Sequence, residues 1–472
     1  MRPATVAVWL VVAMLAGIAL RLAVNRGMSV DEIMNVDQAR LGFGALISQL
    51  THGTHPPLHP VLEWCAVHLF GDGRYAVRIP SLVAGILLIP VAAWLAGDLF
   101  DRRTAVVAGL FTSVAPILIW YSQSADPYAF VALFGTLAII GALRARRRGR
   151  PLDWVLHVLG ASLAVWSSWS GVFIVVATEI LLLLAALQPP PEGRRQMPYL
   201  AAWALDSLAL ACQFVPLGLL FASQMHSNGG VAGVMSVGAA GVTFYTTVSN
   251  LSWAIFGFHP GTVTSALSAV WPLAMLASLV VVGRGAGRRA WLLLICVLVP
   301  ALGTLALGLA APNAFDVRYA IAGVPPLMVA LARMATGWPR GRLGRGLVVA
   351  GVLIVLLGAL ADQQLDPNNP RRFDYRAALT QVRRDQGRSS AVFYEPRNLN
   401  YAVGRYTPGL PAKPLSRTLP PRAQAGSVFL ITSFTDRSQV HKLLDRELGA
   451  LKATRRLVHF RSYPGVDVWW YR

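Results

Sequence analysis

The chain has 472 residues, of which 55% are hydrophobic and only 14% are charged. Ordinary soluble proteins carry about 25% charged residues, so this composition excludes a soluble globular protein of several domains. It also excludes a disordered chain, because disorder requires low hydrophobicity. The net charge is +20, but the basic residues lie in short clusters between long apolar runs. That pattern indicates a membrane, and not a nucleic acid, as the partner.

Eleven apolar runs are long enough to cross a bilayer, whose hydrocarbon core of about 30 Å needs about 20 residues of helix. We expect the first run to be an uncleaved helix and not a signal peptide, because no clear cleavage pattern follows it. The predicted spans are 4–24, 79–97, 104–121, 127–143, 153–169, 171–188, 199–221, 265–282, 290–311, 319–335 and 346–361.

The arginines predict the orientation of these spans. With the amino terminus in the cytoplasm, 17 arginines fall on the inside and 5 in outside loops before residue 362. Positive residues favour the cytoplasmic side of a membrane. We therefore expect a multi-pass protein of the cell membrane with a cytoplasmic amino terminus and an extracytoplasmic carboxyl-terminal segment.

Residues 362–472 combine helical and strand patterns, and their 111 residues suffice for a modest core. Helices are predicted at 375–384 and 439–448, buried strands at 391–394 and 428–432, and a hairpin from 457–463 and 466–471 around Pro464-Gly465. The predicted fold class is an all-α polytopic membrane bundle of about 11 helices (1–361) with a small extracytoplasmic α/β domain (362–472).

Polar residues gather in the first predicted outside loop, residues 25–78, where apolar faces also indicate amphipathic helices lying in the interface. Charge beside a membrane is costly and is usually retained for function. The loop holds the acidic pair Asp31-Glu32 and the run Thr54 to His59. On spacing alone it could also be a solvated connection in which Asp31 caps a helix.

Five short motifs follow one another along the chain. They are Asp31-Glu32; His55-Pro56-Pro57-Leu58; Arg78-Ile79-Pro80-Ser81 with Gly85; Tyr121-Ser122-Gln123 through Tyr128; and Arg318-Tyr319 with Pro325-Pro326. This order resembles integral-membrane glycosyltransferases of the GT-C fold, and more closely the dolichyl-phosphate-mannose–protein mannosyltransferase-like group (family 39-like). The resemblance covers residues 1–145 and 310–335. One departure is Ser124-Ala125-Asp126, where the family usually has Glu-Ala-Arg.

The resemblance implies an enzyme that moves a sugar from a polyprenyl-phosphate donor to an acceptor hydroxyl at the outer membrane face, with inversion. The implied partners are that donor, a glycan, lipid or protein acceptor, and membrane lipids. A phosphate leaves as a stable anion, so it needs charge neutralisation more than a protonating acid. One carboxylate acting as general base, together with cationic groups, is therefore a sufficient set.

Asp31 is the expected base, because it lies just outside the first span, where the family's catalytic acid falls. Glu32 is the fallback. Helical neighbours point about 100° apart, so only one of the two can face a cleft.

For the donor phosphate we expect Arg318, then Arg78 and His55, because a guanidinium offers a permanent charge in a planar fork. Arg318 could instead be an interfacial anchor paired with Asp316. Arg78 could simply extend from the start of the second span to the interface.

Tyr121, Gln123, Asp126, Tyr128 and Tyr319 are the expected substrate-binding residues. The alternative is that the tyrosines belong to an aromatic belt and that Asp126 caps a helix begun by Pro127.

His52, His55 and His59 could form an imidazole–carboxylate site with Asp31 that suits zinc or manganese. No tight ligand spacing supports such a site, and arginines make a cation unnecessary. We therefore expect no metal and no cofactor, with a divalent metal as the alternative.

Two other classes of protein are consistent with the composition. A transporter or flippase of a lipid-linked saccharide would use Glu179 and Asp206, which lie within predicted spans, as an ion relay. Neither internal repeats nor interrupted helices around these acids support it, so we expect structural pairing with polar neighbours. A non-catalytic scaffold would not need the ordered motifs.

Overall fold

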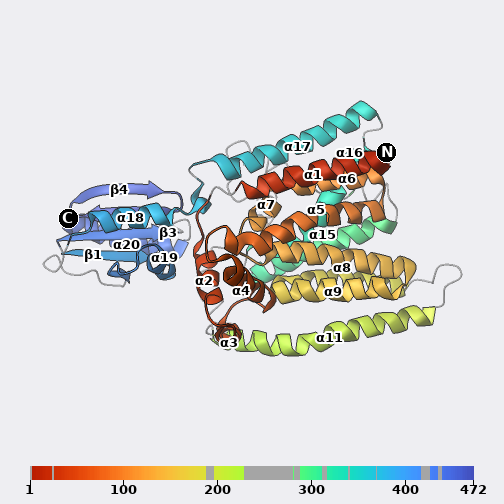
Figure 1. Ribbon diagram of the computed structural model, residues 1–472, viewed down its shortest axis with the longest axis horizontal. Helices are drawn as coiled ribbons and strands as arrows, with labels where there is room; N and C mark the ends of the chain where they lie inside the picture. Colours follow the sequence, from red (N-terminus) through yellow and green to blue (C-terminus); the bar gives the residue numbers. More distant parts are fainter. Residues whose placement is uncertain are drawn as a thin grey trace. The chain divides into compact units, whose positions relative to one another are not determined.

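The structure is a computed structural model with two compact units (Figure 1). The first comprises Met1–Val24, Ala39–Ser236 and Gly241–Gln363, and the second comprises Asn25–Gln38, Val237–Ala240 and Gln364–Arg472. The described residues are 3–23, 26–187, 196–227, 280, 288–310, 316–338, 341–367, 369–387, 389–415, 426–433 and 438–472.

The first unit is a helical bundle (Figure 1). Its helices are α1 (Pro3–Leu22), α3 (Phe43–Gln49), α4 (Leu58–Phe70), α5 (Ile79–Leu99), α6 (Arg102–Val114), α7 (Pro116–Ser122), α8 (Tyr128–Arg148), α9 (Pro151–Ser167), α10 (Val172–Ala186), α11 (Gln196–Ser227), α15 (Arg288–Ala310), α16 (Val324–Gly337) and α17 (Arg342–Leu365). Short 3-10 helices are η1 (Leu50–His52), η2 (Ala76–Arg78), η3 (Trp169–Gly171) and η5 (Val317–Gly323). Helices are expected here because a backbone surrounded by lipid must satisfy its own hydrogen bonds.

Within the described residues, seven helical segments are long and apolar enough to cross a membrane, or eight if α6 and α7 form one bent span. The protein is therefore a multi-pass membrane protein. The predicted count of eleven is not confirmed. Helix α9 has only 17 residues, and of the predicted span 265–282 only Val280 is described.

Helices α8 and α9 pack backbone against backbone through two glycines. A Cβ atom on Gly141 would collide with the backbone of His157, and one on Gly160 would collide with the backbone of Ala138. Small residues permit such close approach between membrane helices. This contact fixes the position of α9 along α8.

The bend between α6 and α7 measures 59° and is braced by a buried arginine. Pro116 starts α7 and has no N–H to continue the ladder of α6. Arg21 of α1, which is 0% exposed, donates hydrogen bonds to the carbonyls of Thr112 (3.4 Å) and Ser113 (3.0 Å) and to Ser122 Oγ (3.1 Å). The guanidinium thereby satisfies carbonyls that the broken helix leaves without an intrahelical partner.

The second unit contains a five-stranded sheet with the order β2-β1-β3-β5-β4 (Figure 1). The pairs β1–β2 and β1–β3 are parallel, whereas β3–β5 and β4–β5 are antiparallel. Its strands are β1 (Ser390–Glu395), β2 (Ala412–Pro414), β3 (Ser427–Ser433), β4 (Leu457–Tyr463) and β5 (Val466–Tyr471). Its helices are α2 (Val30–Ala39), α18 (Tyr375–Asp385), α19 (Leu399–Tyr406) and α20 (Ser438–Thr454), with the 3-10 helix η6 (Pro370–Arg372).

The predicted helices, buried strands and hairpin of the carboxyl-terminal domain are confirmed. Every residue of β3 is buried, as expected for a central strand with apolar side chains on both faces. Gly465 has φ of 70°, a conformation that suits glycine in the hairpin turn. The sequence patterns predict neither α19 nor β2, because elements of only eight and three residues carry little periodic signal.

Residues of α2 group with the second unit, although the sequence analysis treated them as part of a loop of the bundle. Val30, Ile33 and Val36 are fully buried along one face of this helix. Just before it, the Gly27 N–H donates to the carbonyl of Arg372 (2.9 Å). A side chain at Gly27 would collide with the Phe373 carbonyl, so this close contact requires glycine.

Candidate functional site

Four of the predicted site residues come together where α8 begins. The rings of Tyr121 and Tyr128 are 4.9 Å apart, and those of Tyr128 and Tyr319 are 6.3 Å apart, between centroids. The guanidinium carbon of Arg318 lies 5.3 Å from the Tyr128 centroid and 5.8 Å from that of Tyr319. We call Tyr121, Tyr128, Arg318 and Tyr319 the Tyr–Arg cluster.

Asp316 holds Arg318 in place within this cluster. One carboxylate oxygen accepts from the Arg318 N–H (3.0 Å) at the start of η5, and the other lies 3.1 Å from Arg318 Nε. The Arg318 side chain keeps 27% of its surface exposed, whereas Tyr128 keeps 1%. Pairing with Asp316, the expected alternative to a site role for Arg318, coexists with the contact between Arg318 and the tyrosines.

Contacts attach two further predicted segments to the beginning of α8. The Ser81 hydroxyl, three residues after Arg78, donates to the Asp126 carbonyl (2.9 Å). The ring of His59 lies 6.1 Å from that of Phe130 and 6.5 Å from that of His55, between centroids. The segments that carry Arg78 and His55 therefore border the start of α8.

His59 is a neutral imidazole at physiological pH. Burial, and next the neighbouring His55, lower the pKa of His59 to about 3. Glu63 Oε2 lies 3.7 Å from His59 Nδ1, which is beyond hydrogen-bond distance, so burial dominates. Sequence spacing placed His59 with two other histidines but did not reveal that it is 2% exposed.

Gln123 and Asp126, also predicted to bind substrate, make contacts inside the protein. The Gln123 amide nitrogen donates to the carbonyls of Leu20 (2.9 Å) and Arg21 (3.3 Å). Ser124 Oγ donates to the Asp126 carboxylate. These bonds join the α7–α8 connection to α1, and contact of either residue with substrate stays a prediction.

Asp31 and Glu32 have different environments in the second unit. The Ser29 N–H donates to Glu32 Oε2 (2.9 Å), and the Glu32 N–H donates to Ser29 Oγ (3.1 Å). This reciprocal capping box begins α2 and buries Glu32 completely, whereas Asp31 is exposed. The pattern Ser-x-x-Glu is visible in the sequence and could have assigned Glu32 to a cap.

Asp31 lies near Tyr375 of α18. Burial raises the pKa of Tyr375, its hydrogen bond to Ser433 (3.2 Å) opposes that change, and the Asp31 carboxylate adds to the increase. The exposed member of the acidic pair therefore lies within electrostatic range of a tyrosine of its own unit.

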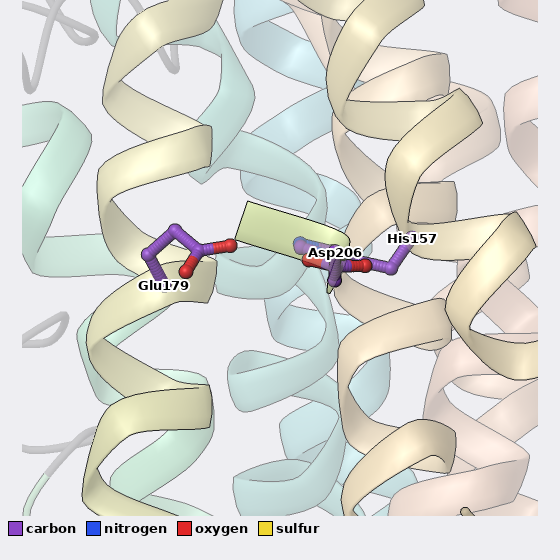
Figure 2. Close-up of side chains that lie close together, drawn as sticks. All are labelled: His157, Glu179 and Asp206. Carbon is purple, nitrogen blue, oxygen red and sulfur yellow. Dashed lines mark hydrogen bonds and ion pairs between the residues drawn. The ribbon is translucent and has the colours of Figure 1, made fainter. Parts of the chain in front are cut away.

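A third group of polar residues connects α9, α10 and α11 (Figure 2). His157, Glu179 and Asp206 each offer one ligand atom within 4.8 Å of the others. His157 Nδ1 lies 2.9 Å from Asp206 Oδ2, and its Nε2 lies 2.9 Å from the Thr178 hydroxyl.

Glu179 also has polar neighbours in this group. Its Oε2 accepts hydrogen bonds from Trp203 Nε1 and Ser207 Oγ, both at 2.9 Å. A histidine with two carboxylates has the chemistry of a zinc site. Here both ring nitrogens of His157 already have polar partners, so the geometry fits the structural pairing that the sequence predicted for Glu179 and Asp206.

This arrangement of apolar helices with a small α/β domain is the GT-C fold of membrane glycosyltransferases. ArnT from Cupriavidus metallidurans in the apo state matches with a TM-score of 0.57 at 13% identity, over 99% of this chain and 98% of that chain. The structure of the same protein bound to undecaprenyl phosphate matches with a TM-score of 0.52 at 12% identity, over 100% of this chain and 98% of that chain. The oligosaccharyltransferase of Archaeoglobus fulgidus in its apo form matches with a TM-score of 0.54 at 14% identity, over 94% of this chain and 71% of that chain.

Residues 54–217 match the model of the family described as dolichyl-phosphate-mannose-protein mannosyltransferase. The resemblance drawn from the sequence motifs is thereby confirmed. No curated protein matches the chain by sequence.

Proposed function

We propose that the protein is an inverting glycosyltransferase that moves a sugar from a polyprenyl-phosphate donor to an acceptor hydroxyl at the outer membrane face. The Tyr–Arg cluster is the observation that supports this proposal most directly. A permanent cation that is 27% exposed and lies against the buried ring of Tyr128 suits an anion that arrives on a lipid. The GT-C fold and the mannosyltransferase-family domain favour a transferase, and the neighbour ArnT has been crystallised with undecaprenyl phosphate.

In this proposal Arg318 neutralises the donor phosphate. Charge builds on the bridging oxygen as the bond between the sugar C1 and that oxygen breaks, and a fixed guanidinium stabilises it without reorganising. Asp316 holds the guanidinium at its Nε edge, 3.1 Å away, which directs the remaining N–H groups elsewhere. Arg78 and His55, from segments that border the start of α8, are proposed as further phosphate ligands.

Asp31 is the proposed general base. It takes the proton of the acceptor hydroxyl while the acceptor oxygen forms its bond to C1, and the polyprenyl phosphate leaves with the electrons of the broken bond. A single displacement of this kind inverts the configuration at C1. The Glu32 carboxylate caps α2 and is fully buried, whereas Asp31 is exposed, which favours Asp31 for this role.

The proposal is tested in a strain that lacks the protein. Mass spectrometry of its cell-envelope glycans should show the loss of one sugar substituent, which a plasmid with the wild-type chain restores. A plasmid with Asp31→Asn should fail to restore it at equal protein level, and Glu32→Gln is the matched control. Envelope glycans identical to those of the parent strain would contradict the proposed function.

A further inference from the structure

A cavity of about 640 Å³ opens where α6 begins, α16 ends and α17 begins. It is lined by Asp101, Arg102, Arg103, Arg333, Thr336, Gly337 and Arg345. The Tyr–Arg cluster lies at the opposite end of α16, whose 14 residues span about 21 Å. The cavity is therefore separate from the proposed transfer site. We call it the arginine pocket.

The lining of the arginine pocket has an excess of positive charge. It contains four arginines and one acid. Both oxygens of that acid are engaged: Asp101 Oδ1 accepts from the N–H groups of Arg103 (2.9 Å) and Thr104 (3.0 Å), and Oδ2 pairs with Arg333 (3.1 Å). The single carboxylate thus caps α6 and offsets one guanidinium, and the lining keeps the character of an anion site.

The arginines come from three different helix ends, and the side chains of two of them are held by contacts within the protein. The Arg333 guanidinium also lies 5.2 Å from the ring centroid of Phe100. Arg345 donates to the carbonyls of Gly341 (3.3 Å) and Thr336 (3.5 Å). These contacts hold Arg333 and Arg345 at the cavity wall, while Arg102 and Arg103 at its α6 side are exposed.

Exposed apolar side chains flank the same helix ends. Trp338, Leu343 and Leu347 are 61%, 79% and 64% exposed, and Leu343 and Leu347, one turn apart, share one face of the first turns of α17. Exposed apolar side chains at the helix ends of a multi-pass membrane protein favour contact with lipid. An anion entering the pocket beside them would gain from an attached acyl chain, which a soluble ion does not have.

We propose that the arginine pocket binds a phosphate group carried by the headgroup of an anionic membrane lipid. Basic pockets between membrane helices commonly recognise headgroups in this way. The proposal does not depend on the glycosyl transfer proposed above.

The experiment titrates the purified full-length protein, in nonionic detergent, with phosphatidylglycerol or with phosphatidylcholine of the same acyl chains. Native mass spectrometry counts the bound lipids. We expect the wild type to prefer phosphatidylglycerol. The double variant Arg102→Gln/Arg345→Gln should bind it about fivefold more weakly per arginine removed. If the double variant does not fold, the same titration uses the single variant Arg102→Gln, whose substituted residue is exposed.

The matched control is Arg148→Gln/Arg150→Gln. It removes the same charge from exposed positions at the same end of the bundle, where Arg144 near the end of α8 pairs with Asp98 near the end of α5. This control should keep the lipid preference. An equal loss in both double variants would assign the preference to general surface charge and overturn the proposal. Unchanged binding by Arg102→Gln and by the pocket double variant would also overturn it.

A third arm adds inorganic phosphate as a competitor. We expect little displacement of phosphatidylglycerol, because the free ion lacks the acyl chain. Full displacement by phosphate at an affinity equal to that of the lipid would make this a site for a soluble anion and overturn the assignment to a lipid.

Discussion

The guanidinium carbon of Arg318 lies 5.3 Å from the centre of the Tyr128 ring, although the two residues are far apart in the sequence. Asp316 fixes the arginine from one side, and the buried tyrosines face it from another. A cation held in this way has already lost its side-chain freedom, so the donor binding proposed for Arg318 carries a low entropic cost.

Substitution of Arg318 should weaken binding of the donor more than binding of the acceptor. A hydrogen bond to a charged group is worth about 1.5–3 kcal/mol, so Arg318→Ala should raise the KM for the polyprenyl-phosphate donor at least about tenfold. The donor KM of Arg318→Lys should lie between those of the wild type and Arg318→Ala, because lysine keeps the charge but loses the planar fork. Steady-state kinetics with the donor and the acceptor varied in turn measure the KM for each substrate. The control is Arg150→Gln, and unchanged donor affinity in Arg318→Ala would remove this residue from the site.

Substitution of Asp31 should lower the turnover rate, whereas substitution of Glu32 should affect stability. Loss of a general base costs about 10²–10⁴ in rate, so Asp31→Asn should lower kcat by that factor with thermal stability unchanged. Glu32→Gln should keep kcat, because glutamine still accepts the hydrogen bond from the Ser29 N–H. Glu32→Ala should instead lower stability by about 1 kcal/mol. Full turnover in Asp31→Asn would refute the assignment of the base.

Arg21 should matter for stability and not for chemistry. Arg21→Met leaves buried carbonyls of Thr112 and Ser113 without their donor, at about 1–3 kcal/mol each. Thermal unfolding in detergent should therefore show a clear decrease in the midpoint. Arg21→Lys should also be destabilising, since one ammonium cannot replace three nitrogens with separate acceptors. If Arg21→Met unfolds at the wild-type temperature, the arginine does not brace the bend between α6 and α7.

Acid should destabilise the wild type partly through His59. Its pKa is lowered from 6.5 to about 3 by burial, so the unfolded chain binds the proton more tightly than the folded protein does. The stability that neutral His59 contributes is complete above pH 6.5 and is lost as pH falls from there toward 3. At pH 5 the loss is about 2 kcal/mol, at 1.36 kcal/mol for each pKa unit.

The variant His59→Gln isolates this effect, because glutamine has no proton to gain in that range. Melting curves of both proteins at pH 7.5 and pH 5 should show a smaller decrease for His59→Gln than for the wild type. An equal decrease in both would show that His59 is not the group responsible.

Local patterns in the sequence were sufficient for the class of protein and for much of the secondary structure. Hydropathy identified a multi-pass membrane protein. Short apolar runs placed β1 and β3, and the Pro464-Gly465 turn placed the β4–β5 hairpin, within a residue or two. The ordered motifs indicated the GT-C fold and named the members of the Tyr–Arg cluster. These features depend on neighbours within a few residues, which the sequence displays directly.

The geometry of the candidate site depended on tertiary structure. Nothing in the sequence showed that the Arg318 guanidinium packs on the Tyr128 ring or that Glu32 is completely buried. Nor did it show that burial keeps His59 neutral at physiological pH. Local pattern did not identify the bracing role of Arg21 either. Such contacts arise between segments that lie far apart along the chain, and their free energies depend on burial and on the closeness of approach. Both quantities exist only once the helices have packed.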